Sequence, residues 1–137
     1  MTRSGERVRT LVVDDQAPFR LAAAGMLRRC PEFALVGEAE SGEQAYALAA
    51  ELAPDLVLMD LRMPGPDGSG IDGLEAARRI RARTPATVVL LCTTYALADL
   101  PPGSGEAVAA YVSKEDLDLE LLRRLWALHR PVTAETG

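Results

Sequence analysis

Residues 56–60 read LVLMD, an apolar run that ends abruptly in an acid. The run predicts a short buried strand rather than a surface segment. A strand that is apolar throughout, with helices before and after it, is typical of a parallel sheet covered on both faces. The stretch therefore predicts an α/β fold with Asp60 at the carboxyl end of one strand.

The same alternation of strand-like and helix-like segments runs outward in both directions. Apolar runs predict strands at 8–13, 34–37, 56–59, 88–91 and 107–112. Helical spacing follows most of them, first at positions 19, 22, 23, 26 and 27. Ser41 followed by Gln44 forms a capping box that opens a second helix. A third helix follows Gly73, and a last one carries leucines at 117, 121, 125 and 128.

Polar residues stand where these strands end. In open parallel sheets ligands bind outside the carboxyl ends of the strands, so these residues are the site candidates. They are Asp14, Asp15, Asp60, Thr93 and Lys114. The fold is expected to bring all five to one edge of one sheet.

The chemistry of this set points to phosphoryl transfer. Three carboxylates close together repel one another and need a compensating cation, for which Mg²⁺ is suited by its preference for oxygen ligands. A carboxylate such as Asp60 can attack phosphorus and form an acyl phosphate. Lys114 would supply a second cation for a phosphoryl oxygen, and the Thr93 hydroxyl a hydrogen-bond donor. Each residue alone has an ordinary structural explanation, but their convergence favours a site.

The sequence resembles the receiver domains of two-component response regulators over nearly its whole length, closest to those that precede a helix-turn-helix effector. The strings that carry the resemblance are LVVDD (11–15), VGEA (36–39), DLVLMDLRMPG (55–65), GLEAARRIR (73–81), Thr93-Thr94 and YVSK (111–114). The resemblance implies a flavodoxin-like three-layer sandwich with a five-stranded parallel sheet in the order 2-1-3-4-5.

The resemblance also implies roles for individual residues. Asp60 would accept the phosphoryl group, and Lys114 would be the accompanying cation. Thr93 and Tyr111 would switch conformation together after phosphorylation. The Mg²⁺ ligands would be Asp14, Asp15, Asp60 and the backbone carbonyl of Arg62.

A receiver of this kind would take its phosphoryl group from a sensor histidine kinase or a small phosphodonor. It would then control transcription or a protein partner, with a homodimer as a further expectation. The chain departs from the family at three places. The loop after Asp60 carries extra residues at 69–73, Pro and Gly at 101–105 replace much of the fourth helix, and Glu106-Ala107 replaces a Gly-Ala pattern.

Composition limits the other possibilities. The formal net charge of −5 gives no electrostatic drive towards nucleic acid or an anionic membrane. No apolar segment has the length of a membrane span, and two distant cysteines outside any CxxC motif agree with a cytoplasmic protein. We expect one receiver domain at 1–130 and a tail or the start of a linker at 131–137.

Three other functions remain open from the sequence. The first is a receiver that acts as a phosphorylation-independent interaction module, which the broken fourth helix slightly supports. The second is a Mg²⁺-dependent phosphatase with an aspartyl nucleophile, disfavoured because Arg62 stands where a second acid is usual. The third is nucleotide binding, disfavoured because no phosphate-loop motif follows the glycines near 65–73. We expect a signalling receiver rather than a metabolic enzyme.

Overall fold

The computed structural model describes residues 7–61, 72–94 and 108–131. They form a five-stranded parallel sheet in the order β2-β1-β3-β4-β5, which confirms the flavodoxin-like fold. The strands are β1 (Val8–Val13), β2 (Phe33–Ala39), β3 (Leu56–Asp60), β4 (Val88–Thr93) and β5 (Ala110–Ser113). The helices are α1 (Ala17–Arg28), α2 (Gly42–Leu52), α3 (Gly73–Arg83) and α4 (Leu119–His129).

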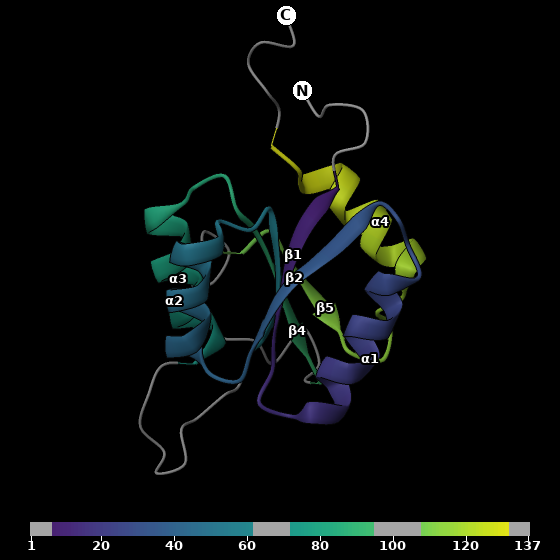
Figure 1. Cartoon of the computed structure of the whole chain (residues 1–137), viewed down its shortest axis with the longest axis horizontal. Coiled ribbons are helices and arrows are strands. Elements are labelled where there is room, and N and C mark those ends of the chain that lie inside the picture. The colour runs from purple at the N-terminus through teal and green to yellow at the C-terminus, as the bar shows by residue number, and fades with distance from the viewer. Residues whose placement is uncertain (1–6, 62–71, 95–107, 132–137) are drawn as a thin grey trace, which may run out of the picture.

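The sheet is the middle layer of three. Helices α2 and α3 lie on one side of it, and α1 and α4 lie on the other (Figure 1). Each side has its own apolar core: Leu11 and Val13 of β1 belong to the α2–α3 side, and Val12 belongs to the α1–α4 side. All three side chains are fully buried. These last three residues of β1 are apolar because both faces of the strand are covered there.

Local signals set several helix boundaries. The Ser41 hydroxyl accepts a hydrogen bond from the Gln44 N–H at 3.1 Å, as the capping box predicts. The Gln44 side chain returns to the N–H of Glu40, one residue before the cap, at 2.8 Å. Asp118 caps α4 in the same way, through the Leu121 N–H at 2.8 Å.

Several sequence predictions about the elements are wrong in detail. Ala22 belongs to the helical spacing of apolar residues in α1 but is exposed, and Ala24 is buried instead. Leu117 precedes α4, and Leu128 at the end of α4 is exposed. The fifth strand begins at Ala110 rather than at residue 107, and its first partner is Leu90. Alanine has a weak strand preference, so an alanine-rich start gives no clear boundary.

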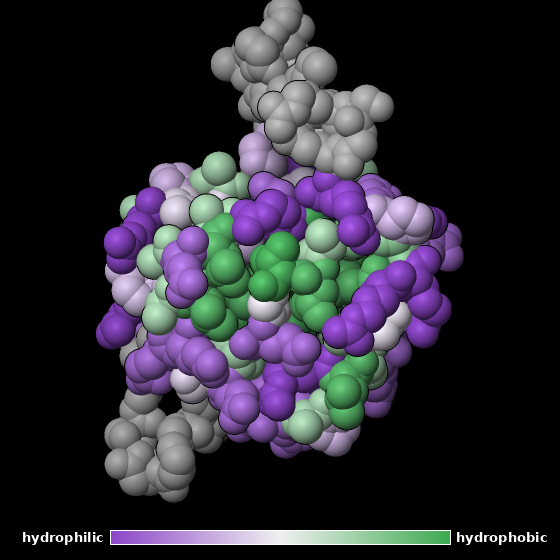
Figure 2. All heavy atoms as spheres, viewed as in Figure 1, coloured by the Kyte–Doolittle hydropathy of each residue, from purple (hydrophilic) through white to green (hydrophobic). Residues whose placement is uncertain are grey.

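The expected fourth helix of the family falls largely on residues 95–107, outside the described part of the chain. Within the described part, the edge strand β2 leaves Leu35 and Val36 partly exposed. Apolar surface accordingly runs across the middle of the face on which β2 lies between the two helical layers (Figure 2). None of the described helices is long and apolar enough to cross a membrane.

Candidate functional site

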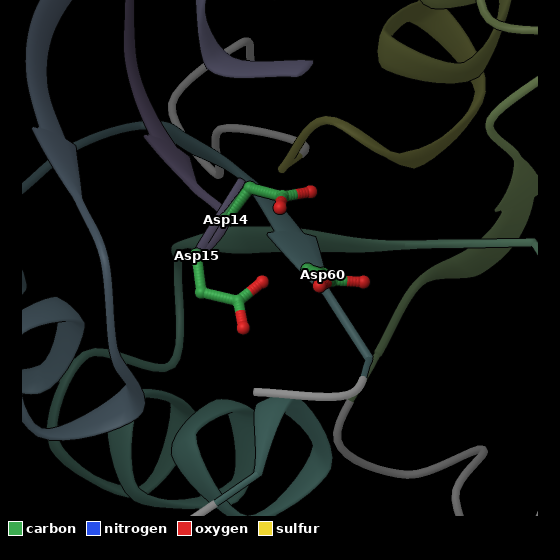
Figure 3. A group of neighbouring side chains, drawn as sticks. All are labelled: Asp14, Asp15 and Asp60. Atoms are coloured by element: carbon green, nitrogen blue, oxygen red, sulfur yellow. The ribbon is translucent and has the colours of Figure 1, made fainter. Parts of the chain in front are cut away.

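The ends of β1 and β3 bring three acidic side chains together. Asp14 and Asp15 follow β1, Asp60 is the last residue of β3, and the three emerge close to one another (Figure 3). One carboxylate oxygen from each lies within 4.8 Å of the others. Asp14 is fully buried, Asp60 is nearly so at 8% exposure, and Asp15 is exposed. The convergence of these three carboxylates at one sheet edge is confirmed.

Asp14 is held in place by the elements around it. Its N–H donates to the Ala39 carbonyl at the end of β2, at 3.0 Å. One carboxylate oxygen accepts the Gln16 N–H at 2.8 Å, and its carbonyl accepts the Arg20 guanidinium at 2.7 Å. Arg20 also lies 3.5 Å from the Glu38 carboxylate. The turn between β1 and α1 is therefore fixed before any ligand arrives.

Lys114, which directly follows β5, contacts two of the three acids. Its Nζ lies 2.6 Å from Asp14 Oδ2 and 3.3 Å from Asp60 Oδ1, and the backbone N–H of Lys114 donates to the Thr93 carbonyl at 2.9 Å. Burial disfavours the charged ammonium, but the hydrogen bond to Asp14 and the two negative charges outweigh it and raise the pKa of Lys114. The ammonium is thus charged at neutral pH and partly neutralises the acids.

Thr93 and Tyr111 lie on the same face of the sheet. Tyr111 pairs with Leu91 in the β4–β5 ladder, and Thr93 lies two residues beyond Leu91, so all three side chains point to the α2–α3 side. Thr93 is buried, and the buried Tyr111 hydroxyl has no hydrogen-bond partner among the described residues. Arg62, the expected carbonyl ligand, lies outside the described residues.

Cys92 is the direct neighbour of Asp60 in the β3–β4 ladder, but it is a poor nucleophile. Burial is the main reason that the pKa of its thiol rises to about 12. The thiol therefore stays protonated at neutral pH, and the thiolate is the nucleophilic form of cysteine. Of Cys92 and Asp60, Asp60 is therefore the side chain suited to attack phosphorus.

Gly73 packs the first turn of α3 against the backbone of the Asp60 strand end. Its N–H donates to the Leu61 carbonyl at 2.9 Å, so Gly73 lies directly against the residue that follows β3. A Cβ on Gly73 would collide with the Asp60 carbonyl, with the Asp60 carbonyl carbon only 2.9 Å away and Leu61 Cα at 3.0 Å. Only a residue without a side chain fits there.

Gly73→Ala is therefore expected to lower the free energy of unfolding by about 3 kcal/mol, because a backbone segment has to move. Gly25→Ala is the matched control, since within the described part of the chain a Cβ on Gly25 would contact only the flexible end of Arg29, at 3.9 Å. In the middle of α1 this change should instead stabilise by about 0.5–1 kcal/mol. Urea denaturation measures both, and similar effects from the two changes would contradict the predicted clash.

The donors at this edge fit a hard divalent cation. The three side chains that come together all offer carboxylate oxygens, the ligands that Mg²⁺ prefers. Exposed Asp15 leaves the group open to solvent, and Mg²⁺ usually keeps several waters. Asp14, Asp15 and Asp60 are thus the described residues that could hold such an ion.

Three residues near the acids were not singled out as site residues from the sequence. Phe19 was read only as an apolar helix position, yet its ring lies over Lys114. Arg20 and Gly73 contact the backbones of Asp14 and Asp60. The local sequence hints at their role only by position: Phe19 and Arg20 come soon after the acid pair, and Gly73 begins a helix.

Comparison with known proteins assigns the chain to a family. A family model of the response regulator receiver domain matches residues 10–124. Over 108 residues the chain is 39% identical to response regulator GacA of Pseudomonas viridiflava, covering 78% of this chain and 48% of that protein. Over 103 residues it is 37% identical to protein-glutamate methylesterase/protein-glutamine glutaminase 1 of Methanosarcina acetivorans, covering 75% of this chain and 27% of that protein.

A solved structure supports the same family assignment. The two-component response regulator of the LuxR family from Aurantimonas sp. SI85-9A1 superposes with a TM-score of 0.77 at 31% identity. The match covers 96% of this chain and 92% of that one. The chain spans less than half the length of both curated relatives, so their complete activities are properties of those longer proteins.

Proposed function

Because this chain belongs to the response regulator receiver domain family, we propose that it accepts a phosphoryl group on Asp60 with the help of Mg²⁺. The donor is a sensor histidine kinase or a small phosphodonor. One observation carries the proposal: Lys114 reaches both Asp14 and Asp60 at the edge where the three carboxylates converge. This is the combination of nucleophile, cation and metal ligands that phosphoryl transfer to a carboxylate requires.

In the proposed step a carboxylate oxygen of Asp60 attacks the phosphorus of the donor. A bond forms between that oxygen and phosphorus, the bond from phosphorus to the donor breaks, and its electron pair leaves with the donor. Lys114 keeps its proton and balances negative charge on the phosphoryl oxygens, from a position 3.3 Å from Asp60 Oδ1. Bound Mg²⁺ would supply further charge neutralisation, with Asp14, Asp15 and Asp60 as ligands and the Arg62 carbonyl as a proposed fourth.

We propose that Thr93 and Tyr111 report the phosphorylation. They share a face of the sheet, and Thr93 lies at the end of β4, beside the strand that carries Asp60. The buried Tyr111 hydroxyl has no hydrogen-bond partner among the described residues, so a rearrangement of its neighbours after phosphorylation could supply one. The Thr93 hydroxyl would then donate to a phosphoryl oxygen of Asp60.

The proposed partner is a sensor histidine kinase, with a homodimer as a second expectation. We further propose a cytoplasmic signalling switch rather than a metabolic enzyme, acting on transcription or on a protein. Its receiver would occupy residues 1–130, ahead of a tail or linker start at 131–137, and would bind neither nucleic acid nor membrane.

Incubation with acetyl phosphate and Mg²⁺, followed by intact-mass spectrometry, tests the function. We expect a mass increase of one phosphoryl group that disappears when EDTA replaces Mg²⁺. An unchanged mass in the presence of Mg²⁺ would contradict the phosphoacceptor role. A phosphorylation-independent interaction module would then be the better account of the same fold.

A further inference from the structure

The aromatic ring of Phe19 is a third neighbour of the Lys114 ammonium. Nζ lies 4.6 Å from the ring centroid, in addition to its contacts of 2.6 Å with Asp14 and 3.3 Å with Asp60. A cation above an aromatic face within about 6 Å is attracted by the negative face of the ring. The ammonium therefore lies between two carboxylates and one ring.

The position of the ring is set by the protein and not by the ammonium. Phe19 belongs to the first turn of α1, and residues on both sides of it are tied to Asp14: the Gln16 N–H at 2.8 Å and the Arg20 guanidinium at 2.7 Å. Phe19 is partly buried and packs against the core on the α1–α4 side. The same turn that fixes Asp14 thus also fixes the ring.

Lys114 needs such a neighbour because its side chain is long and flexible. Four methylene groups carry the ammonium, and ordering them costs conformational entropy. Asp14 holds the ammonium more closely than Asp60 does, at 2.6 Å against 3.3 Å. Without the ring, we expect the ammonium to spend more time beside Asp14 or in solvent and less beside Asp60. A ring on a further side restricts that motion.

We propose that Phe19 is a positioning residue for phosphoryl transfer, whose ring keeps the Lys114 ammonium beside Asp60. The effect on rate rests on the proposed function, whereas the position of the ring can be tested without it. Phe19 makes no bond to the phosphoryl group and moves no proton. It acts through Lys114, because an ammonium that is already in place needs less rearrangement when charge develops on the phosphoryl oxygens.

The first experiment observes the contact directly in the metal-free, unphosphorylated protein. A proton held over an aromatic face resonates upfield, so we expect the ε-methylene protons of Lys114 upfield of ordinary lysine positions in NMR spectra. They should return to ordinary positions in Phe19→Leu and stay upfield in Phe19→Tyr, which keeps a ring. If the Lys114 ε-methylene protons of the unmodified protein resonate at ordinary lysine positions, the proposal is overturned.

The second experiment measures the rate of phosphorylation by acetyl phosphate with Mg²⁺. We expect Phe19→Leu to lower the rate roughly three- to tenfold, the range of a cation–π contact at a partly buried site. Phe19→Tyr should restore most of the rate. In a Lys114→Met background, Phe19→Leu should have no further effect, because the residue through which it acts is gone.

Phe33→Leu is the matched control for loss of packing. Phe33 is fully buried in the same core cluster, so the substitution should lower stability while leaving the phosphorylation rate unchanged. An equal loss of rate from Phe19→Leu with and without Lys114 would show a role in packing and overturn the proposal. If the unmodified protein takes no phosphoryl group, the proposed function fails, and the NMR experiment alone decides whether the ring positions Lys114.

Discussion

Asp60→Asn is expected to abolish phosphorylation by acetyl phosphate. The amide has the size of the carboxylate but lacks the charged oxygen that attacks phosphorus. Because the two side chains have the same size, asparagine should fit at this almost fully buried position beside Lys114 without moving β3. Intact-mass spectrometry should show no added phosphoryl group at donor concentrations that fully modify the unmodified protein.

Asp55→Asn is the matched control for this substitution. Asp55 precedes the same strand at its opposite end, where its carboxylate accepts the Arg9 N–H at 2.9 Å. The asparagine oxygen can accept the same bond, so phosphorylation should be unaffected. Persistent phosphorylation of Asp60→Asn, or its loss in Asp55→Asn, would contradict the assignment of Asp60 as the nucleophile.

Asp15→Asn is expected to remove about half or more of the stabilisation by magnesium. A ligand that binds only the folded protein stabilises it by about 2.7 kcal/mol at one hundred times its dissociation constant, so Mg²⁺ should raise the Tm of the unmodified protein. Asparagine keeps an oxygen but loses the negative charge. We expect the Mg²⁺ affinity of the Asp15→Asn protein to fall at least roughly tenfold, since the binding of a hard cation is strengthened by the negative charge of its ligands.

Without magnesium the same substitution should not lower Tm. Asp15 is exposed, and its carboxylate has an oxygen within 4.8 Å of oxygens of the Asp14 and Asp60 carboxylates. Removing its charge therefore relieves repulsion. Differential scanning fluorimetry with EDTA and with a series of Mg²⁺ concentrations measures both effects, with Asp55→Asn again as the control. An undiminished response to Mg²⁺ in Asp15→Asn would exclude this carboxylate as a ligand.

The acids were predictable from the sequence because their positions follow from the topology. In a parallel sheet all strands end at one edge, and β1 pairs directly with β3, so an acid pair after β1 and an acid at the end of β3 lie close together. The cap of α2 was predictable for a similar reason, since Ser41 and Gln44 interact over three residues. Such features need only the element order or the local sequence.

The other contacts depend on packing between segments that are distant in sequence. Gly73 is required by the backbone of Asp60, 13 residues earlier, and no local turn signal reports that collision. Phe19 reads as an ordinary core position until Lys114 is placed above it. The start of β5 was misplaced because its alanines carry little strand preference. Tertiary geometry, and not the local sequence, decides the first two.

A crystal structure with Mn²⁺ in place of Mg²⁺ and beryllofluoride as a phosphoryl analogue would test the central claim most directly. We predict one anomalous peak bound by the carboxylates that follow β1 and end β3, with the beryllium on an oxygen of residue 60 and the Lys114 ammonium on a fluorine. A metal peak elsewhere, or beryllofluoride attached to another side chain, would contradict the account.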